Sequence, residues 1–262
     1  MDAFSVRTKI MIGGGMDALA QRLHRVFLVT DKFMDESGKT NYVTDRLLRN
    51  SGEFKIFSDV QADPDIATVT RGVEQILEFQ PDAVVAFGGG SAIDAAKAIV
   101  FFAARERDMR DCKFIAIPTT CGTGSEVTNI SIMARTRIGT KLGLVSPAMY
   151  ADYAVLIPQL LEGLPFKVFA ASSIDALVHA VESALSPKAT PYTKLFGYKA
   201  IEMIIRGYQT IAKKGPESRF SLLNDFLLAS NYAGLAFGTG GHETTSLCLE
   251  ALDQLVQGLS LI

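Results

Sequence analysis

AVVAFGGGSAIDAAKA, residues 83–98, is the stretch that decides the fold of this 262-residue chain. A short apolar β-strand, 83–87, is followed by three glycines and a serine, and an apolar helix begins near Ala92. Similar alternation predicts a helix over 64–79 and strands over 26–30, 114–117, 141–145 and 153–157, the second of these strands halted by Pro118. The first 165 residues therefore predict an α/β domain with a mostly parallel sheet.

The glycine turn after the central strand is a candidate phosphate site. Glycine lets a ligand approach the backbone closely, and the start of a helix offers unpaired N–H groups to an anion. Ser91 and Asp94 also have the spacing of a capping box variant, so a tight turn that only caps the helix is the alternative. The predicted pyrophosphate site consists of Gly88, Gly89, Gly90 and Ser91.

Long periodic segments replace the strands beyond Pro165. Helices are predicted over 166–185, 191–212 and 219–237, separated by proline and glycine. We therefore predict two domains, an α/β domain over 1–165 and an all-α domain over 166–262.

Polar residues follow two other predicted strands. The loop 119–125 carries four hydroxyls and two glycines, and ligands of open α/β sheets gather at such strand ends. Asp31 follows the strand 26–30, where a carboxylate can bind the adenosine ribose and repel a 2′-phosphate, which favours NAD over NADP. A polar surface loop and an ordinary turn aspartate are the alternatives.

Asp175 and His179 lie four residues apart on a predicted helix and so share one face. One oxygen and one nitrogen suit Fe²⁺, Zn²⁺ or Mn²⁺, but a catalytic metal needs at least one more ligand. Glu182 extends the same face as a candidate supporting residue. The alternative is a hydrogen-bonded couple that holds the histidine side chain in place.

The composition and charge of the chain indicate which partners and which cellular compartment to expect. The net charge of −2 arises from 26 basic and 28 acidic residues without a long block of either sign, so no nucleic-acid partner is expected. Three cysteines without CxxC spacing and no apolar signal segment favour a reducing cytoplasm. Apolar runs such as 95–104 are too short to span a membrane, so no membrane partner is expected.

Three segments together, GGGSAIDAAKA (88–98), PTTCGTGSEVT (118–128) and DALVHAVE (175–182), resemble the iron-containing alcohol dehydrogenase family in order and spacing. The stretches YADYAVLIP (150–158) and SPKATPYTKLF (186–196) look especially similar to its 4-hydroxybutyrate dehydrogenase branch. The resemblance implies the dehydroquinate synthase-like fold of this family, with a Rossmann-like NAD domain and a helical metal domain.

The resemblance also implies roles. NAD and a divalent metal, iron by family, would be the cofactors, with Asp175 and His179 as the first two metal ligands. A homodimer or larger homo-oligomer would be the assembly. The implied cofactor-binding residues are Asp31, Gly88, Gly89, Gly90, Ser91, Asp94, Thr119, Thr120, Thr123 and Lys141.

The family pattern stops near Gly241. The position expected to hold a further histidine ligand falls near Ser246, one helical turn beyond His242, so we expect a helical domain truncated by a shifted frame or a shortened gene. The alternative is a natural short form that completes the metal site with His242.

The function expected from the resemblance is NAD-dependent, metal-dependent interconversion of a small primary alcohol and its aldehyde, with 4-hydroxybutyrate and succinate semialdehyde as the expected pair. Two alternatives stay open. One is an inactive nucleotide-binding fragment that holds no metal, and the other is a related enzyme such as a glycerol dehydrogenase or a dehydroquinate synthase-like lyase.

Overall fold

The computed structural model describes residues 4–13, 15–135 and 140–238, and the predicted ligand candidate His242 lies outside them. Contacts divide the chain into two compact units. The α/β unit comprises Val6–Thr119 and Ser125–Ile157, and the helical unit comprises Met1–Ser5, Thr120–Gly124 and Pro158–Ile262. The segment Thr120–Gly124 thus leaves the α/β unit for five residues and then returns.

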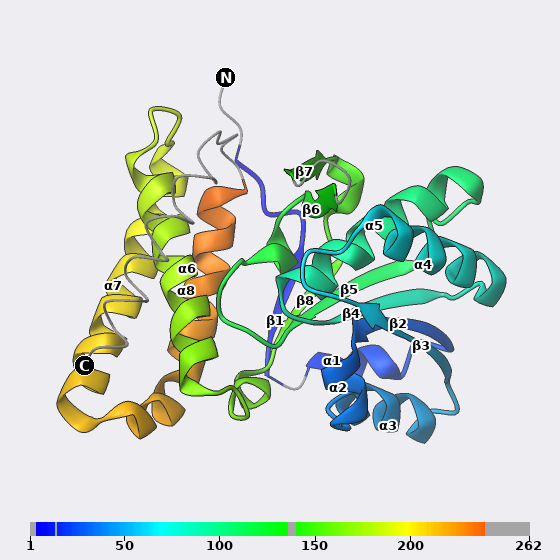
Figure 1. Cartoon of the computed structure of the whole chain (residues 1–262), viewed down its shortest axis with the longest axis horizontal. Helices are drawn as coiled ribbons and strands as arrows, with labels where there is room; N and C mark the ends of the chain where they lie inside the picture. The colour runs from blue at the N-terminus through cyan, green and yellow to red at the C-terminus, as the bar shows by residue number, and fades with distance from the viewer. Residues whose placement is uncertain (1–3, 14, 136–139, 239–262) are drawn as a thin grey trace. The chain divides into compact units, whose positions relative to one another are not determined.

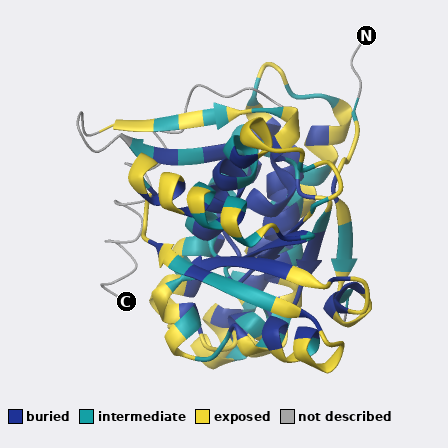
Figure 2. Ribbon diagram, turned by 90° about the vertical axis from the view of Figure 1, so that its right-hand side faces the viewer, coloured by how far each residue is buried: buried dark blue, intermediate teal, exposed yellow. Residues whose placement is uncertain are grey.

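Six parallel strands form the sheet of the α/β unit, in the order β1-β8-β5-β4-β2-β3 (Figure 1). The apolar residues of its central strands are buried on both faces, as a parallel sheet requires (Figure 2). The predicted parallel α/β class is confirmed, and the prediction that Pro118 ends its strand is confirmed too. The strands are β1 (Lys9–Ile12), β2 (Arg25–Asp31), β3 (Glu53–Val60), β4 (Ala83–Gly88), β5 (Lys113–Pro118) and β8 (Tyr153–Leu156).

Helices cover both faces of this sheet. Figure 1 shows α4 (Ile66–Phe79) and α5 (Gly90–Glu106) on one side, with α1 (Gly15–Ala20), α2 (Lys32–Glu36) and α3 (Asn41–Arg49) on the other. Asp65 begins α4 as its N-cap and accepts a hydrogen bond from the Thr68 N–H.

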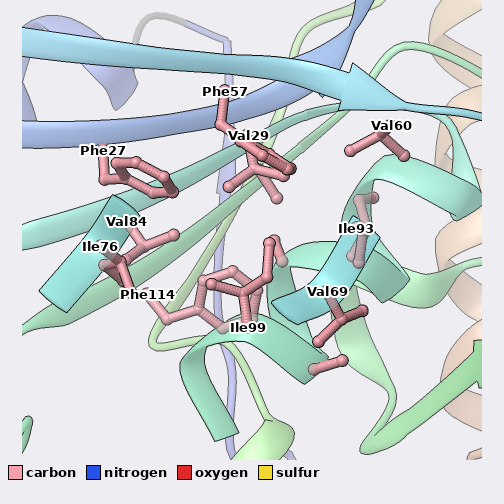
Figure 3. Packing of buried hydrophobic residues seen from close by; sticks show 14 of the residues in the cluster. Phe27, Val29, Phe57, Val60, Val69, Ile76, Val84, Ile93, Ile99 and Phe114 are labelled. Carbon is pink, nitrogen blue, oxygen red and sulfur yellow. The ribbon is translucent and has the colours of Figure 1, made fainter. Parts of the chain in front are cut away.

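The main core lies between the sheet and the α4–α5 pair. Phe27, Phe57 and Val84 from the strands meet Ile76 of α4 and Ile99 of α5 (Figure 3). Because α5 is buried along most of its length, its position is set by packing on the sheet and on α4. This packing fixes the direction in which α5 leaves the glycine turn.

A β-hairpin and short 3₁₀ turns complete the α/β unit. The antiparallel strands are β6 (Ile130–Arg135) and β7 (Thr140–Val145), and the turns are η1 (Ser125–Val127) and η2 (Pro147–Met149). Another turn, η3 (Pro158–Leu161), begins the longest part of the helical unit.

The helical unit is built on α6 (Phe166–Leu185), α7 (Pro191–Lys214) and α8 (Leu223–Phe237), which pack against one another. The prediction of one α-helix over 219–237 is wrong at its start, because a 3₁₀ helix, η4 (Pro216–Leu222), precedes α8. The hydroxyls of Ser218 and Ser221 each donate to the carbonyl three residues earlier, which favours this tighter turn.

By length and composition alone, α6 is long and apolar enough to cross a membrane, and no other helix in the described part of the chain is. A helix at the centre of a soluble bundle passes the same test, and α6 packs against both α7 and α8. It also carries Asp175, His179 and Glu182 within its span.

Candidate functional site

The strand order reverses between β2 and β4, which is where open α/β sheets bind ligands. From β2 the chain continues outward to β3, whereas from β4 it continues in the other direction to β5. The two strands run in register, and the Thr30 hydroxyl donates a 2.7 Å hydrogen bond to the Phe87 carbonyl. Asp31 ends β2 and Gly88 ends β4, so both residues lie at this switch point.

The glycine turn leads directly into α5. Gly88 has φ +156°, and a Cβ on it would lie 2.7 Å from the Cβ of Ala92, so only glycine fits. The helix begins at Gly90 with Gly89 as N-cap, and no side chain caps it. The alternative interpretation of Ser91 and Asp94 as a capping box is therefore wrong, because the Asp94 carboxylate bonds to Ser125 and Ile132 instead. The first N–H groups of a 17-residue helix thus lack a side-chain cap.

One carboxylate oxygen of Asp31 caps the helix that follows it. Its Oδ1 accepts a 2.9 Å hydrogen bond from the Met34 N–H and so caps α2. Its Oδ2 lies 3.7 Å from the position that a Cβ on Gly88 would take. One carboxylate oxygen is therefore placed beside the glycine turn.

The hydroxyl loop, which we define as Thr119–Ser125, divides between the two units. Thr119 stays in the α/β unit, where its N–H donates to the Gly88 carbonyl at 3.0 Å. Its Oγ1 is buried without a hydrogen-bond partner among the described residues, which is unusual for a buried hydroxyl. Thr120 is half-buried and Thr123 is exposed, and both belong to the helical unit.

Within the helical unit the middle of this loop is packed tightly. Cys121 Sγ lies 3.5 Å from Ser172 Oγ of α6. Gly124 has φ +59°, and a Cβ on it would lie 2.6 Å from Gly234 Cα of α8. Glycine at both positions allows the loop and α8 to touch backbone to backbone.

Lys97 is a buried residue that sequence reasoning missed. It lies on α5 with no exposed surface, and its ammonium bonds to Ser125, at the end of the hydroxyl loop, and to residues just beyond it. Burial lowers the pKa of Lys97 to about 8, an effect that the nearby carboxylates of Asp94 and Glu126 oppose. A lysine inside an otherwise apolar helical run, followed downstream by closely spaced hydroxyls, is the signal that could have found it.

Lys141 forms an ion pair within the α/β unit. It lies on β7, half exposed, and its Nζ is 2.8 Å from Asp63 Oδ1. No described contact joins Lys141 to Asp31 or to the glycine turn, so its predicted role at the cofactor stays a prediction.

Asp175 and His179 form the candidate metal pair on α6. His179 Nδ1 lies 3.8 Å from Asp175 Oδ2, beyond hydrogen-bond distance, and has no hydrogen-bond partner in the described structure. The His179 ring packs against Phe237 with ring centroids 4.7 Å apart. Burial raises the pKa of Asp175, and His179 opposes this rise. The alternative of a hydrogen-bonded couple is therefore not what this pair forms.

This donor set fits a divalent metal in type but is incomplete by itself. A carboxylate oxygen and an unpartnered imidazole nitrogen suit iron, zinc or manganese. Over the described ranges, no third histidine, cysteine, aspartate or glutamate joins them in a group of three.

A parallel sheet with a glycine turn at its switch point, joined in one chain to a helical bundle, defines a two-unit protein whose first unit is an open, doubly wound α/β fold. Two family models match the chain: iron-containing alcohol dehydrogenase over residues 8–158, and the C-terminal part of the Fe-containing alcohol dehydrogenase family over 169–245. The chain belongs to the iron-containing alcohol dehydrogenase family.

Similar proteins include several with named substrates. The 4-hydroxybutyrate dehydrogenase of Clostridium kluyveri is 40% identical over 203 residues, covering 73% of this chain and 55% of that protein. The 1-propanol dehydrogenase PduQ of Salmonella typhimurium is 35% identical over 246 residues, covering 92% and 65%. The solved structure of sulfoacetaldehyde reductase from Bifidobacterium kashiwanohense in complex with NAD+ has a TM-score of 0.83 and 26% identity, covering 97% and 71%. This chain therefore spans between half and two thirds of the length of the first two relatives.

Proposed function

We propose that this chain acts as an NAD-dependent, metal-dependent alcohol dehydrogenase that interconverts a small primary alcohol and its aldehyde. The observation that carries the proposal is the meeting of Asp31 and the glycine turn at the switch point of the sheet. The family supports the same chemistry, and the similar sulfoacetaldehyde reductase from Bifidobacterium kashiwanohense was solved in complex with NAD+.

The proposed cofactor site uses backbone and side-chain groups together. The N–H groups at the start of α5 bind the pyrophosphate, because they lack a side-chain cap and carry the positive end of the helix dipole. Asp31 accepts from the adenosine ribose and disfavours a 2′-phosphate by charge repulsion. Thr119 supplies a buried hydroxyl beside the same turn.

Asp175 and His179 are the proposed metal ligands of the helical unit. When bound, the metal would polarise the substrate oxygen as a Lewis acid and the nicotinamide would carry the hydride. The residues themselves supply one oxygen and one nitrogen, and Phe237 limits rotation of the imidazole by packing on it. Among the described residues, no group of three or more histidine, cysteine, aspartate and glutamate side chains forms around this pair.

The proposed substrate pair is 4-hydroxybutyrate and succinate semialdehyde. Support comes from the 40% identity to a 4-hydroxybutyrate dehydrogenase. Other relatives are named for 1-propanol and sulfoacetaldehyde, so substrate choice varies among similar proteins. The substrate is therefore the part of this proposal to test by direct competition.

Cofactor binding is tested first. Calorimetric titration should show NAD+ binding tighter than NADP+, and Asp31→Ser should reduce that preference by about tenfold, or about 1.4 kcal/mol. Asp35→Ser removes a charge from the same helix away from the ribose position and is the matched control. Absence of NAD+ binding by the unmodified chain would overturn the proposal.

Turnover is tested on chain loaded anaerobically with Fe²⁺, Zn²⁺ or Mn²⁺. NADH oxidation with succinate semialdehyde is expected, and Asp175→Ala should abolish it while NAD+ binding persists. NAD+ binding without metal-dependent turnover would reduce the function to nucleotide binding. A preference for glycerol with NAD+ over 4-hydroxybutyrate with NAD+ would overturn the substrate assignment.

A further inference from the structure

Lys97 is fully buried on α5, and all three of its ammonium hydrogens have an acceptor. Nζ donates to Ser125 Oγ at 2.7 Å, to Thr128 Oγ1 at 3.0 Å and to the Ile130 carbonyl at 2.8 Å. An ammonium has three donors and no acceptor, so these contacts use its hydrogen-bonding capacity completely. The three acceptors come from the short segment in which the chain returns from the helical unit to the α/β unit.

Asp94, one helical turn earlier, holds the same segment. Its carboxylate accepts from the Ser125 hydroxyl at 2.5 Å and from the Ile132 N–H at 3.0 Å. The Ser131 hydroxyl donates to the Asp94 carbonyl at 2.7 Å. Lys97 Nζ lies 3.7 Å from Asp94 Oδ1, so the two side chains also compensate each other's charge.

These contacts join two parts of the proposed cofactor site. The glycine turn opens α5, and Asp94 and Lys97 lie on the following turns of that helix. Through them α5 holds the end of the hydroxyl loop at Ser125, while the other end of the loop is tied to the turn by the Thr119–Gly88 backbone hydrogen bond. One rigid helix therefore sets the position of both ends of the loop relative to the glycine turn.

Packing alone does not explain an ammonium at this position. Methionine has similar length and would fill the same space without the desolvation cost of a charge. What methionine lacks is three directional donors, and these determine where Ser125, Thr128 and the Ile130 carbonyl lie. The lysine therefore contributes the positions of these three acceptors, and not packing.

We propose that Lys97 is a positioning residue for dinucleotide binding, whose ammonium, together with Asp94, holds the Ser125 end of the hydroxyl loop in place relative to the glycine turn. The inference rests on the proposed function, because it assumes that NAD binds at this turn. Lys97 acts through the loop and makes no contact with the cofactor itself. Its loss reduces affinity because the loop must then be ordered at the expense of binding energy.

The test compares Lys97→Met with the unmodified chain by NAD+ titration. The dissociation constant should rise at least about tenfold at pH 7. Ile99→Val is the matched control, since Ile99 is buried on the same helix but lies beside Gly72 in the hydrophobic core. It should lower stability without changing NAD+ affinity. Ser125→Ala removes one acceptor of the ammonium, should weaken NAD+ binding in the same direction, and replaces Lys97→Met as the test if that variant does not fold.

A pH profile separates positioning from a purely structural role. The charged groups that face Lys97 are Asp94 on its own helix and Glu126 on η1. Loss of the ammonium proton should therefore raise the NAD+ dissociation constant by about fivefold from pH 7 to 9 in the unmodified chain. The profile should be flat in Lys97→Met.

Equal NAD+ affinity of Lys97→Met and the unmodified chain, or a flat pH profile for both, would overturn this inference and leave the proposed function intact. Failure of the unmodified chain to bind NAD+ would overturn both.

Discussion

Replacing Gly234 with alanine is expected to destabilise the helical unit, although alanine is the better helix former. Gly234 lies inside α8, where glycine-to-alanine substitution by itself gains about 1 kcal/mol. A Cβ on Gly234 would lie 2.6 Å from the Gly124 carbonyl oxygen and 2.8 Å from Gly124 Cα. Helix propensity therefore predicts that Gly234→Ala stabilises the protein, whereas packing predicts that it destabilises the protein.

The magnitude follows from how far the backbone must move. Ordinary contact begins at 3.4 Å, so the loop or the helix must shift by 3.4 − 2.6 = 0.8 Å. Within the helical unit the loop is held by the Cys121–Ser172 contact, so it cannot shift freely. Overpacking against such a site costs about 3 kcal/mol, which leaves a net loss of about 2 kcal/mol.

Urea unfolding followed by far-UV circular dichroism measures this change. We expect a lower midpoint for Gly234→Ala at an unchanged m-value. Asn224→Ala places alanine at an exposed position of the same helix and should change stability by no more than a few tenths of a kcal/mol. A gain of about 1 kcal/mol for Gly234→Ala would refute the close contact between the loop and α8.

Three further outcomes are expected. Asp65→Ala should lower the free energy of unfolding by about 1 kcal/mol in urea titrations, because α4 loses its N-cap hydrogen bond. Burial lowers the pKa of Lys97 to about 8, so the folded chain loses this proton before the unfolded chain does. From pH 7 to 9 the unmodified chain should therefore gain about 1 kcal/mol relative to Lys97→Met. This comparison cancels the effect of the partly buried Cys112 thiol, whose raised pKa of about 12 lowers stability above pH 9 in both proteins. Gly88→Ala should abolish calorimetric NAD+ binding, whereas Gly13→Ala, with φ +69° and nothing within 4 Å of its added Cβ, should leave it unchanged.

Much of the site was predictable because its signals are local. The strand 83–87, the glycine turn and the following helix appear in the structure as β4, the turn and α5. The helix predicted over 166–185 has the same bounds in α6. In each case the apolar period and the flanking glycine or proline lie within a few residues of the element that they define.

The role of Asp94 was not predictable in the same way. Its spacing from Ser91 is that of a capping box, yet its carboxylate bonds to Ser125 and Ile132, more than thirty residues away. A tertiary partner displaced a local one because a buried carboxylate must be satisfied by whatever donors packing brings to it.

The sequence by itself determined the parallel α/β class, the glycine turn at a strand end and the placement of Asp175 and His179 on one helix, because strand and helix periods are properties of neighbouring residues. Only the tertiary structure decided that the glycine turn meets Asp31 at the switch point and that the hydroxyl loop passes through the helical unit. It also decided that Lys97 bonds to Ser125, where the chain re-enters the α/β unit. Strand order and buried hydrogen bonds join residues far apart in the chain, and packing rather than local pattern selects those partners.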